Sequence, residues 1–160
     1  MAEFVPYLVM AALVGVGLIG GLLFVFSNFA MRAFAKLPEG EGMRAMQEIN
    51  RTILNPLFLV IFMGTTAVAA ASVVVGVMHT AAVWSTGLIA GGLLFGLGVF
   101  VVTAAGNVPL NNRLDRAEAD SEEGRALWAT YLRVWTKYNH VRVVSSVLAI
   151  LAYGQALWSC

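Results

Sequence analysis

The chain has 160 residues, of which 59% are hydrophobic and only 12% are charged, a composition that excludes an ordinary soluble domain. Ten Lys and Arg residues against nine Asp and Glu residues leave a net charge of +1, without the basic surplus of a nucleic-acid-binding protein. The single cysteine, Cys160, excludes an intrachain disulfide and a cysteine-based metal site. Composition therefore predicts a protein of the lipid bilayer.

Four stretches without charged residues predict four membrane-spanning helices, because about 20 apolar helical residues cross the hydrocarbon layer. The first lies between Glu3 and Arg32, and the next two share the uncharged interval from Thr52 to Asn112. We expect spans at about 5–31, 56–77, 82–108 and 139–158, within one transmembrane domain covering 1–160. The first span is expected to be retained, since no Lys or Arg precedes it as in a signal peptide.

The positive charges predict the orientation of these spans. Lys and Arg residues occur only in the segments 32–55 and 109–138 and at Arg142. Because positively charged loops stay in the cytoplasm, we expect both segments inside, both termini outside, and a multi-pass protein of the cytoplasmic membrane. The acidic stretch 115–123 is interpreted as a solvated linker.

The predicted fold is all-α: an integral membrane four-helix bundle with amphipathic helical segments on the cytoplasmic side. The halves resemble each other, since Glu41-Gly42 and Glu123-Gly124 each open a helix that leads into a span. They are either two parallel hairpin repeats or unrelated segments. Small-residue spacings predict close helix packing or a homo-oligomer contact. These glycine pairs are Gly17/Gly21, Gly87/Gly91 and Gly92/Gly96.

Uncharged polar residues gather near the cytoplasmic ends of all four spans. An amide buried without a partner costs roughly 2 kcal/mol or more, so these groups should bond to each other or to a ligand. We therefore predict a polar pocket there. Its candidate binding residues are Asn28, Gln47, Asn50, Asn55, Asn107 and Asn111.

The start of span four supplies the remaining candidates. Trp135, Asn139, Arg142 and Ser146 are spaced to share one helix face, whereas His140 points about 100° away from Asn139. An arginine near the hydrocarbon usually faces a cavity or a partner, and an imidazole at a pocket mouth suits a general base or a ligand. Structural alternatives stay open: Asn55 before Pro56 suits a helix N-cap, Trp135 an interfacial belt and Arg142 snorkelling.

Four ordered motifs carry a resemblance over nearly the whole chain. They are Phe26-Ser-Asn-Phe-Ala-Met31, Met46-Gln-Glu-Ile-Asn50 with Asn55-Pro-Leu-Phe58, Asn107-Val-Pro-Leu-Asn111, and Trp135-Thr-Lys-Tyr-Asn-His-Val-Arg142. Together they resemble the anthrone oxygenase-like family of small membrane proteins, most of whose bacterial members are a domain of unknown function. The resemblance implies a monooxygenase that oxidises an anthrone to an anthraquinone without a metal or flavin.

If that chemistry applies, His140 would remove the acidic benzylic proton, and the electron-rich anion would react with O₂. Trp135, Phe24 and Phe29 would form the walls of a slot for a flat ring, while Asn28, Asn107, Asn139 and Arg142 would donate hydrogen bonds to the oxyanion. Two other hypotheses stay open. One is a redox protein that binds haem or quinone at His140, and the other is a non-enzymatic membrane subunit that binds or transports a small amphipathic molecule.

Overall fold

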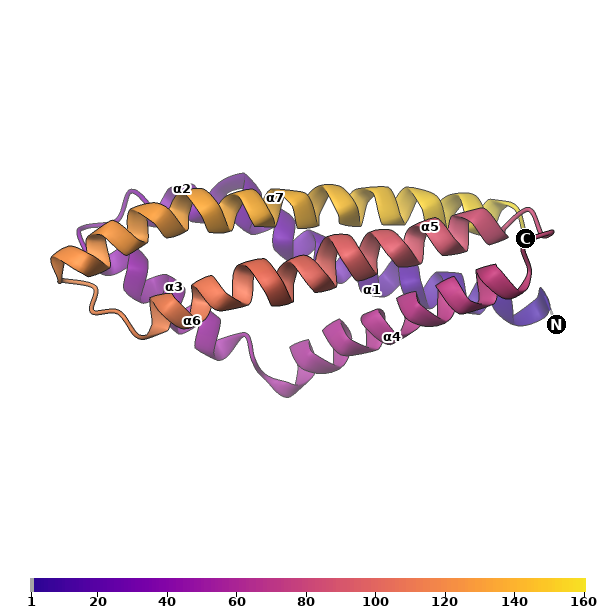
Figure 1. Cartoon of the computed structure of the whole chain (residues 1–160), viewed down its shortest axis with the longest axis horizontal. Helices are drawn as coiled ribbons and strands as arrows, with labels where there is room; N and C mark the ends of the chain where they lie inside the picture. The colour runs from indigo at the N-terminus through magenta and orange to yellow at the C-terminus, as the bar shows by residue number, and fades with distance from the viewer. Residues whose placement is uncertain (1) are drawn as a thin grey trace.

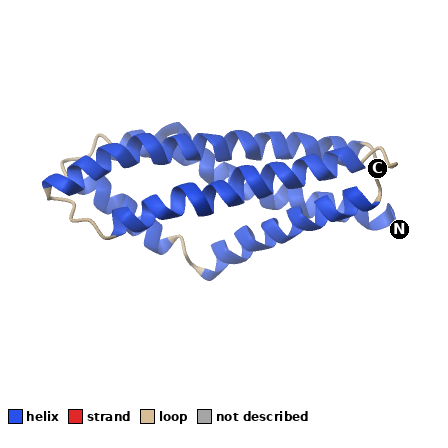
Figure 2. Cartoon of the chain, viewed as in Figure 1, coloured by secondary structure: helices blue, strands red, loops and turns tan. Residues whose placement is uncertain are grey.

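The computed structural model describes residues 2–160, and all the regular structure in this range is helical (Figure 1 and Figure 2). Helix α1 packs on α4 and α7, and α5 packs on the same two helices, so four helices form a bundle. The termini and the α4–α5 turn lie at one end, and α2, α3 and α6 at the other, here called the polar end. The elements are η1 (Ala2–Phe4), α1 (Val5–Val25), η2 (Phe26–Ala30), α2 (Met31–Phe34), α3 (Glu41–Thr52), α4 (Pro56–Met78), α5 (Ser85–Phe95), η3 (Gly96–Val101), η4 (Thr103–Asn107), α6 (Val108–Asp115) and α7 (Glu122–Trp158).

Four continuous helical stretches are long and apolar enough to cross a membrane: Val5–Phe34, Pro56–Met78, Ser85–Asp115 and Glu122–Trp158. They confirm the four expected spans and identify a multi-pass membrane protein. The third and fourth stretches extend well past the expected boundaries at 108 and 139. Because α7 has 37 residues, it is about 55 Å long and exceeds the hydrocarbon thickness. Most of the expected segment 109–138 is helical, as predicted, and it continues the third and fourth helices of the bundle.

Local capping explains where two long helices begin. Asn55 accepts a hydrogen bond from the backbone N–H of Phe58 at 3.0 Å, and Pro56 occupies the first turn of α4. Ser121 accepts one from the N–H of Gly124 at 2.9 Å and starts α7. Asn55 is thus the N-cap that its position before a proline suggested.

Glycines near the starts of two helices allow a backbone carbonyl group of the preceding segment to approach closely. A Cβ at Gly42 would overlap the carbonyl oxygen of Phe34, and one at Gly124 would overlap that of Glu118. The Glu-Gly pairs that the sequence matched between the two halves therefore have the same packing role. Duplication of the halves itself stays a prediction.

The prediction that the glycine pairs mark close helix packing was only partly correct. Cβ atoms at Gly87 and Gly92 would meet the backbone carbonyls of Ala152 and Ala69, at 2.6 and 2.5 Å respectively. The prediction for Gly17 and Gly21 was wrong for contacts within the chain, since a Cβ there would meet nothing within 4 Å. The spacing identifies a smooth helix face but not the direction in which that face points.

The buried side chains form two clusters that follow one another along the long axis of the bundle. One is aliphatic and aromatic and runs through α1, α4, α5 and α7, and the other fills the polar end. The chain makes π-helical turns at η2, η3 and η4, where the first and third long helices continue toward the polar end. Such turns are rare and recur at functional sites, because each inserted residue rotates the helix face that follows it.

Candidate functional site

A cavity of about 310 Å³ lies between the two clusters, at the depth of the π-helical turns. Its volume is at the lower end of the range for small-ligand sites, about 300 to 1,000 Å³. The lining comes from α1, η2, α3, α4, the η3–α6 stretch and α7, and it is mainly apolar. The polar or charged members of the lining are Asn50, Thr103, Asn111, Trp135 and Arg142.

Aromatic rings form much of the cavity wall. Phe26 meets Trp135 edge to face, with ring centroids 5.7 Å apart. Across the cavity, Phe62 stacks with Phe58 at 5.6 Å and with Phe100 at 5.9 Å. Such a wall suits a flat, apolar molecule, because aromatic pairs prefer offset or edge-to-face contacts.

Part of the wall is not covered by protein. Leu54, Leu59 and Met63 line the cavity and are also exposed on the outside of the bundle. Leu59 and Met63 belong to the first turns of α4, where that helix diverges from the others (Figure 1). A ligand in the cavity would therefore lie close to the surrounding lipid.

Among residues 2–160, Arg142 is the only charged residue in the cavity lining, and it is 5% exposed. It donates to Asn139 Oδ1 at 2.7 Å and to Thr103 Oγ1 at 3.2 Å, and its guanidinium lies 5.2 Å from the Trp135 ring centre. Its Nε is buried without a hydrogen-bond partner, and none of the ion pairs within residues 2–160 includes Arg142. The cavity therefore holds a positive charge that no protein carboxylate neutralises, which is costly unless an anion binds there.

Asn139 does not line the cavity, but it orients the guanidinium of Arg142. Its amide nitrogen donates to the carbonyl of Leu23 at 2.8 Å and to Ser27 Oγ at 2.7 Å, which leaves its oxygen to accept from Arg142. His140 Nδ1 lies 2.9 Å from the same Ser27 oxygen. His140 is thus linked to Arg142 through Ser27 and Asn139 and does not line the cavity.

The structure brings together the face of α7 that the sequence predicted. Trp135, Asn139, Arg142 and Ser146 are all buried, whereas His140 is exposed, as the rotation of about 100° requires. Trp135 belongs to the interior and not to an interfacial belt. Arg142 does not snorkel to the outside, since its guanidinium faces the cavity.

Several expected cavity residues lie elsewhere. Phe24 and Phe29, the expected walls, are 53% and 57% exposed on the outer side of α1 and η2, and Asn28 is exposed beside them. The actual wall residue on this segment is Phe26. It follows buried Ile19 and Leu23 at the helical spacing i, i+4, i+7, a signal that could have identified it.

Three other predicted binding residues have structural partners and do not line the cavity. Gln47 donates to the carbonyls of Leu114 and Ala117 at 2.8 and 3.0 Å, which fixes α3 to the end of α6. Asn107 donates to the Trp135 carbonyl at 3.2 Å, and its buried oxygen has no partner. Asn55 caps α4 on the exposed side.

Sequence reasoning missed Tyr131 and Thr103 as parts of the site. Tyr131 is fully buried, stacks near Trp135 at 5.7 Å and donates to Asn111 Oδ1 at 2.8 Å. It precedes Trp135 by one helical turn, so the periodicity of α7 contained this signal. Thr103 approaches Arg142 from η4, and nothing in the sequence indicated that contact.

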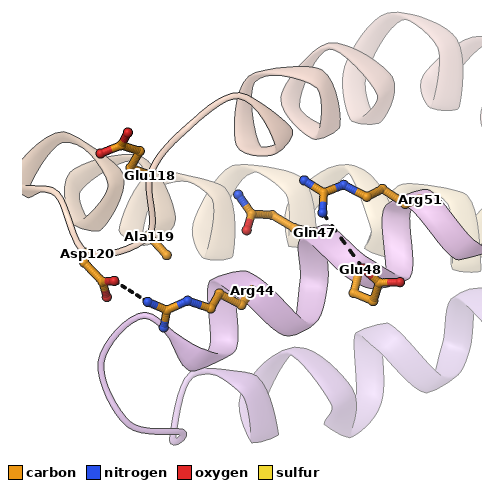
Figure 3. Close-up of a pocket in the computed structure, with 7 residues that line it drawn as sticks. All are labelled: Arg44, Gln47, Glu48, Arg51, Glu118, Ala119 and Asp120. Atoms are coloured by element: carbon orange, nitrogen blue, oxygen red, sulfur yellow. Dashed lines mark hydrogen bonds and ion pairs between the residues drawn. The ribbon is translucent and has the colours of Figure 1, made fainter.

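A second, more open hollow at the polar end is lined by charged side chains (Figure 3). Arg44 pairs with Asp120 and Glu41, and Arg51 pairs with Asp115 and Glu48. The hydrogen bond to Asp120 raises the pKa of Arg44. These exposed pairs join the 115–121 connection to α3. Most of this connection is exposed, in agreement with the solvated linker that the sequence predicted. Since its arginines are neutralised by acids, this hollow is a weaker candidate for ligand binding than the cavity around Arg142.

Within residues 2–160, no three His, Cys, Asp or Glu side chains lie close enough together to hold a metal ion. The two histidines lie on different elements, His79 directly after α4 and His140 in the middle of α7. His140, the expected haem or quinone ligand, faces away from the cavity.

Comparison with known proteins identifies one family. The family model described as anthrone oxygenase matches residues 58–152, which include nearly all of α4, the whole of α5 and α6, and the cavity face of α7. No curated protein and no solved structure matches the chain. Asn111, Trp135, Asn139 and Arg142 all lie within the matched range, which is more than half of the sequence. The chain therefore belongs to the anthrone oxygenase family.

Proposed function

We propose that the protein is a membrane-embedded oxygenase that oxidises a flat aromatic ketone or phenol, such as an anthrone, with O₂. One observation carries the proposal: the guanidinium of Arg142 is buried in an apolar, aromatic-walled cavity without a carboxylate partner. Such a charge is stabilised by a ligand that becomes anionic there. Membership in the anthrone oxygenase family agrees with this chemistry.

The role of Arg142 follows from the acidity of the substrate. An anthrone is the keto form of a phenol, and either form loses a proton to give the same ring-stabilised anion. Its oxygen carries much of the charge, and the guanidinium of Arg142, which lines the cavity, would bind it. Preorganised donors of this kind typically contribute about 10²- to 10³-fold in rate.

The anion itself supplies the electrons for the oxidation. It transfers an electron to O₂, and the two radicals combine at the ring carbon to form a peroxide anion. This anion takes up one proton, equivalent to the one that the substrate lost, and the resulting hydroperoxide loses water to give the quinone. One oxygen atom enters the product and the other leaves as water with the two hydrogens of the ring CH₂ group. The chain's own residues bind the ring and hold the oxyanion.

We assign His140 a positioning role in this scheme. Its ring reaches the cavity only through Ser27 and Asn139, the residue that orients Arg142. Direct removal of a substrate proton would require His140 to line the cavity, and it does not.

The test is O₂ consumption by purified protein with anthrone, compared with the spontaneous oxidation of anthrone in the same micelles. We expect consumption of one O₂ per quinone formed, and its loss in Arg142→Gln. Asn112→Gln, an exposed change outside the cavity, serves as the matched control. Rates equal to the spontaneous reaction in the wild-type protein would refute the proposal.

A second candidate is a quinone-binding redox protein, which the same aromatic walls and guanidinium favour. A quinone carbonyl would accept from Arg142 as the oxyanion does. Binding of a quinone without any O₂ consumption in the presence of anthrone would favour this reading.

We propose the cytoplasmic membrane as the location, with the polar end inside the cell. All the Lys and Arg residues lie toward that end of the bundle, on α2, α3, α6, α7 and their connections. The positive-inside bias then places both termini outside.

A further inference from the structure

Beside Arg142, the cavity-lining residues Asn50, Asn111 and Trp135 form a chain of hydrogen bonds with the buried Tyr131. Trp135 Nε1 donates to Asn111 Oδ1 at 2.8 Å, and Tyr131 donates its hydroxyl hydrogen to the same oxygen at 2.8 Å. Asn50 Nδ2 in turn lies 3.4 Å from the Tyr131 oxygen and donates to it. Both asparagines are half-buried and line the cavity.

The indole of Trp135 determines how both amides are oriented. An indole N–H can only donate, so the group of Asn111 that faces it must be the amide oxygen. Tyr131 has a single hydroxyl hydrogen, which it uses on that same oxygen. Asn50 can therefore bond to Tyr131 only as a donor, and its amide nitrogen must face the phenol.

These bonds leave one donor group and one acceptor group free at the cavity. Within residues 2–160 the amide nitrogen of Asn111 makes no hydrogen bond, and neither does the amide oxygen of Asn50. Both free groups belong to amides that bond to the same hydroxyl of Tyr131 and that line the cavity. A neutral group that both donates and accepts matches them, and a hydroxyl is the simplest such group.

We propose that Asn111 and Asn50 form a subsite for a neutral hydroxyl group, phenolic or alcoholic, on the ring-shaped ligand held at Arg142. The ligand hydroxyl accepts from Asn111 Nδ2 and donates to Asn50 Oδ1. This inference rests on the proposed function for the identity of the ring, and it adds a specificity-determining pair to the cavity. A carboxylate would suit the pair poorly, because it offers no hydrogen to Asn50.

The test uses stable product-like probes, so that binding is measured apart from turnover. Anthraquinone and its monohydroxy isomers are titrated into purified protein in detergent micelles, with quenching of tryptophan fluorescence as the readout. At least one monohydroxy isomer is expected to bind about five- to tenfold more tightly than anthraquinone, the gain of one net hydrogen bond.

Asn111→Asp is the decisive variant, because a carboxylate still accepts from Trp135 and Tyr131 but has no N–H for the ligand. The preference for the hydroxylated probe should disappear in this variant. Asn112→Asp adds the same charge at the neighbouring exposed position and should keep the preference. Asn50→Leu, which removes the acceptor, provides a second test should Asn111→Asp not fold.

The outcomes separate the two proposals. If hydroxylated and parent probes bind alike, or if Asn111→Asp and Asn50→Leu both keep the preference, the hydroxyl subsite is overturned while the proposed function stands. If neither probe binds to the wild-type protein, the proposed function is overturned and the subsite with it.

Discussion

Replacing Arg142 by Gln tests whether this residue stabilises the fold or serves the oxidation of a ligand. Burying an arginine in a membrane helix costs about 2.5–3.5 kcal/mol at the centre of the bilayer and less toward its edge. Against this, the change weakens the bond to Asn139 Oδ1, and an unsatisfied buried acceptor costs about 1–3 kcal/mol. The two effects are of similar size, so we expect the free energy of unfolding to change little or to rise slightly.

A structurally essential arginine would behave differently. Breaking a buried ion pair typically destabilises by about 3–5 kcal/mol, but Arg142 has no carboxylate partner to leave behind. For a chain of this size, about 1 kcal/mol corresponds to a Tm change of about 2–4 °C. Arg142→Gln should therefore melt within a few degrees of the wild-type protein.

The functional effect should be large in the same variant. We expect the rate of O₂ consumption with anthrone to fall about 10²- to 10³-fold, as for loss of an oxyanion donor. Arg142→Lys keeps the charge but loses the planar fork, and should be intermediate. Thermal melting and O₂ uptake are measured on the same preparations. A Tm drop above about 10 °C together with unchanged catalysis would refute the reasoning, because Arg142 would then serve the fold and not the ligand.

Three further predictions follow from the geometry. His140→Ala should lower the oxidation rate less than tenfold, since a general base contributes about 10²- to 10⁴-fold and this ring lies outside the cavity; a loss of that larger size would restore the base role. Gly92→Ala should lower the free energy of unfolding by about 1–3 kcal/mol through overpacking against α4, while Gly96→Ala, which meets nothing within 4 Å, should leave Tm nearly unchanged; equal Tm values would contradict the packing. The exposed Cys160 should react with a membrane-impermeant maleimide on intact cells, whereas Glu118→Cys in a Cys160→Ser background should react only after permeabilisation; the reverse pattern would invert the proposed orientation.

The sequence alone predicted the number of membrane spans, the residues that share a helix face and one helix cap. Charge-free stretches must be about 20 residues long to cross the bilayer, so the number of spans and their approximate positions could be predicted. Helical periodicity alone placed Trp135, Asn139, Arg142 and Ser146 on one face and His140 on another. The N-cap role of Asn55 could also be predicted, because an N-cap depends only on the first turn of its helix.

Only the tertiary structure decided what each of those faces meets. The packing of α1 shows that the face of Ile19, Leu23 and Phe26 meets the cavity, whereas Phe24 and Phe29 lie on the outside. The partners of Gln47 and Asn107 are backbone carbonyls of distant segments, which no sequence spacing encodes. Periodicity specifies which residues share a helix face, whereas the neighbours of that face depend on how long helices rotate and pack together.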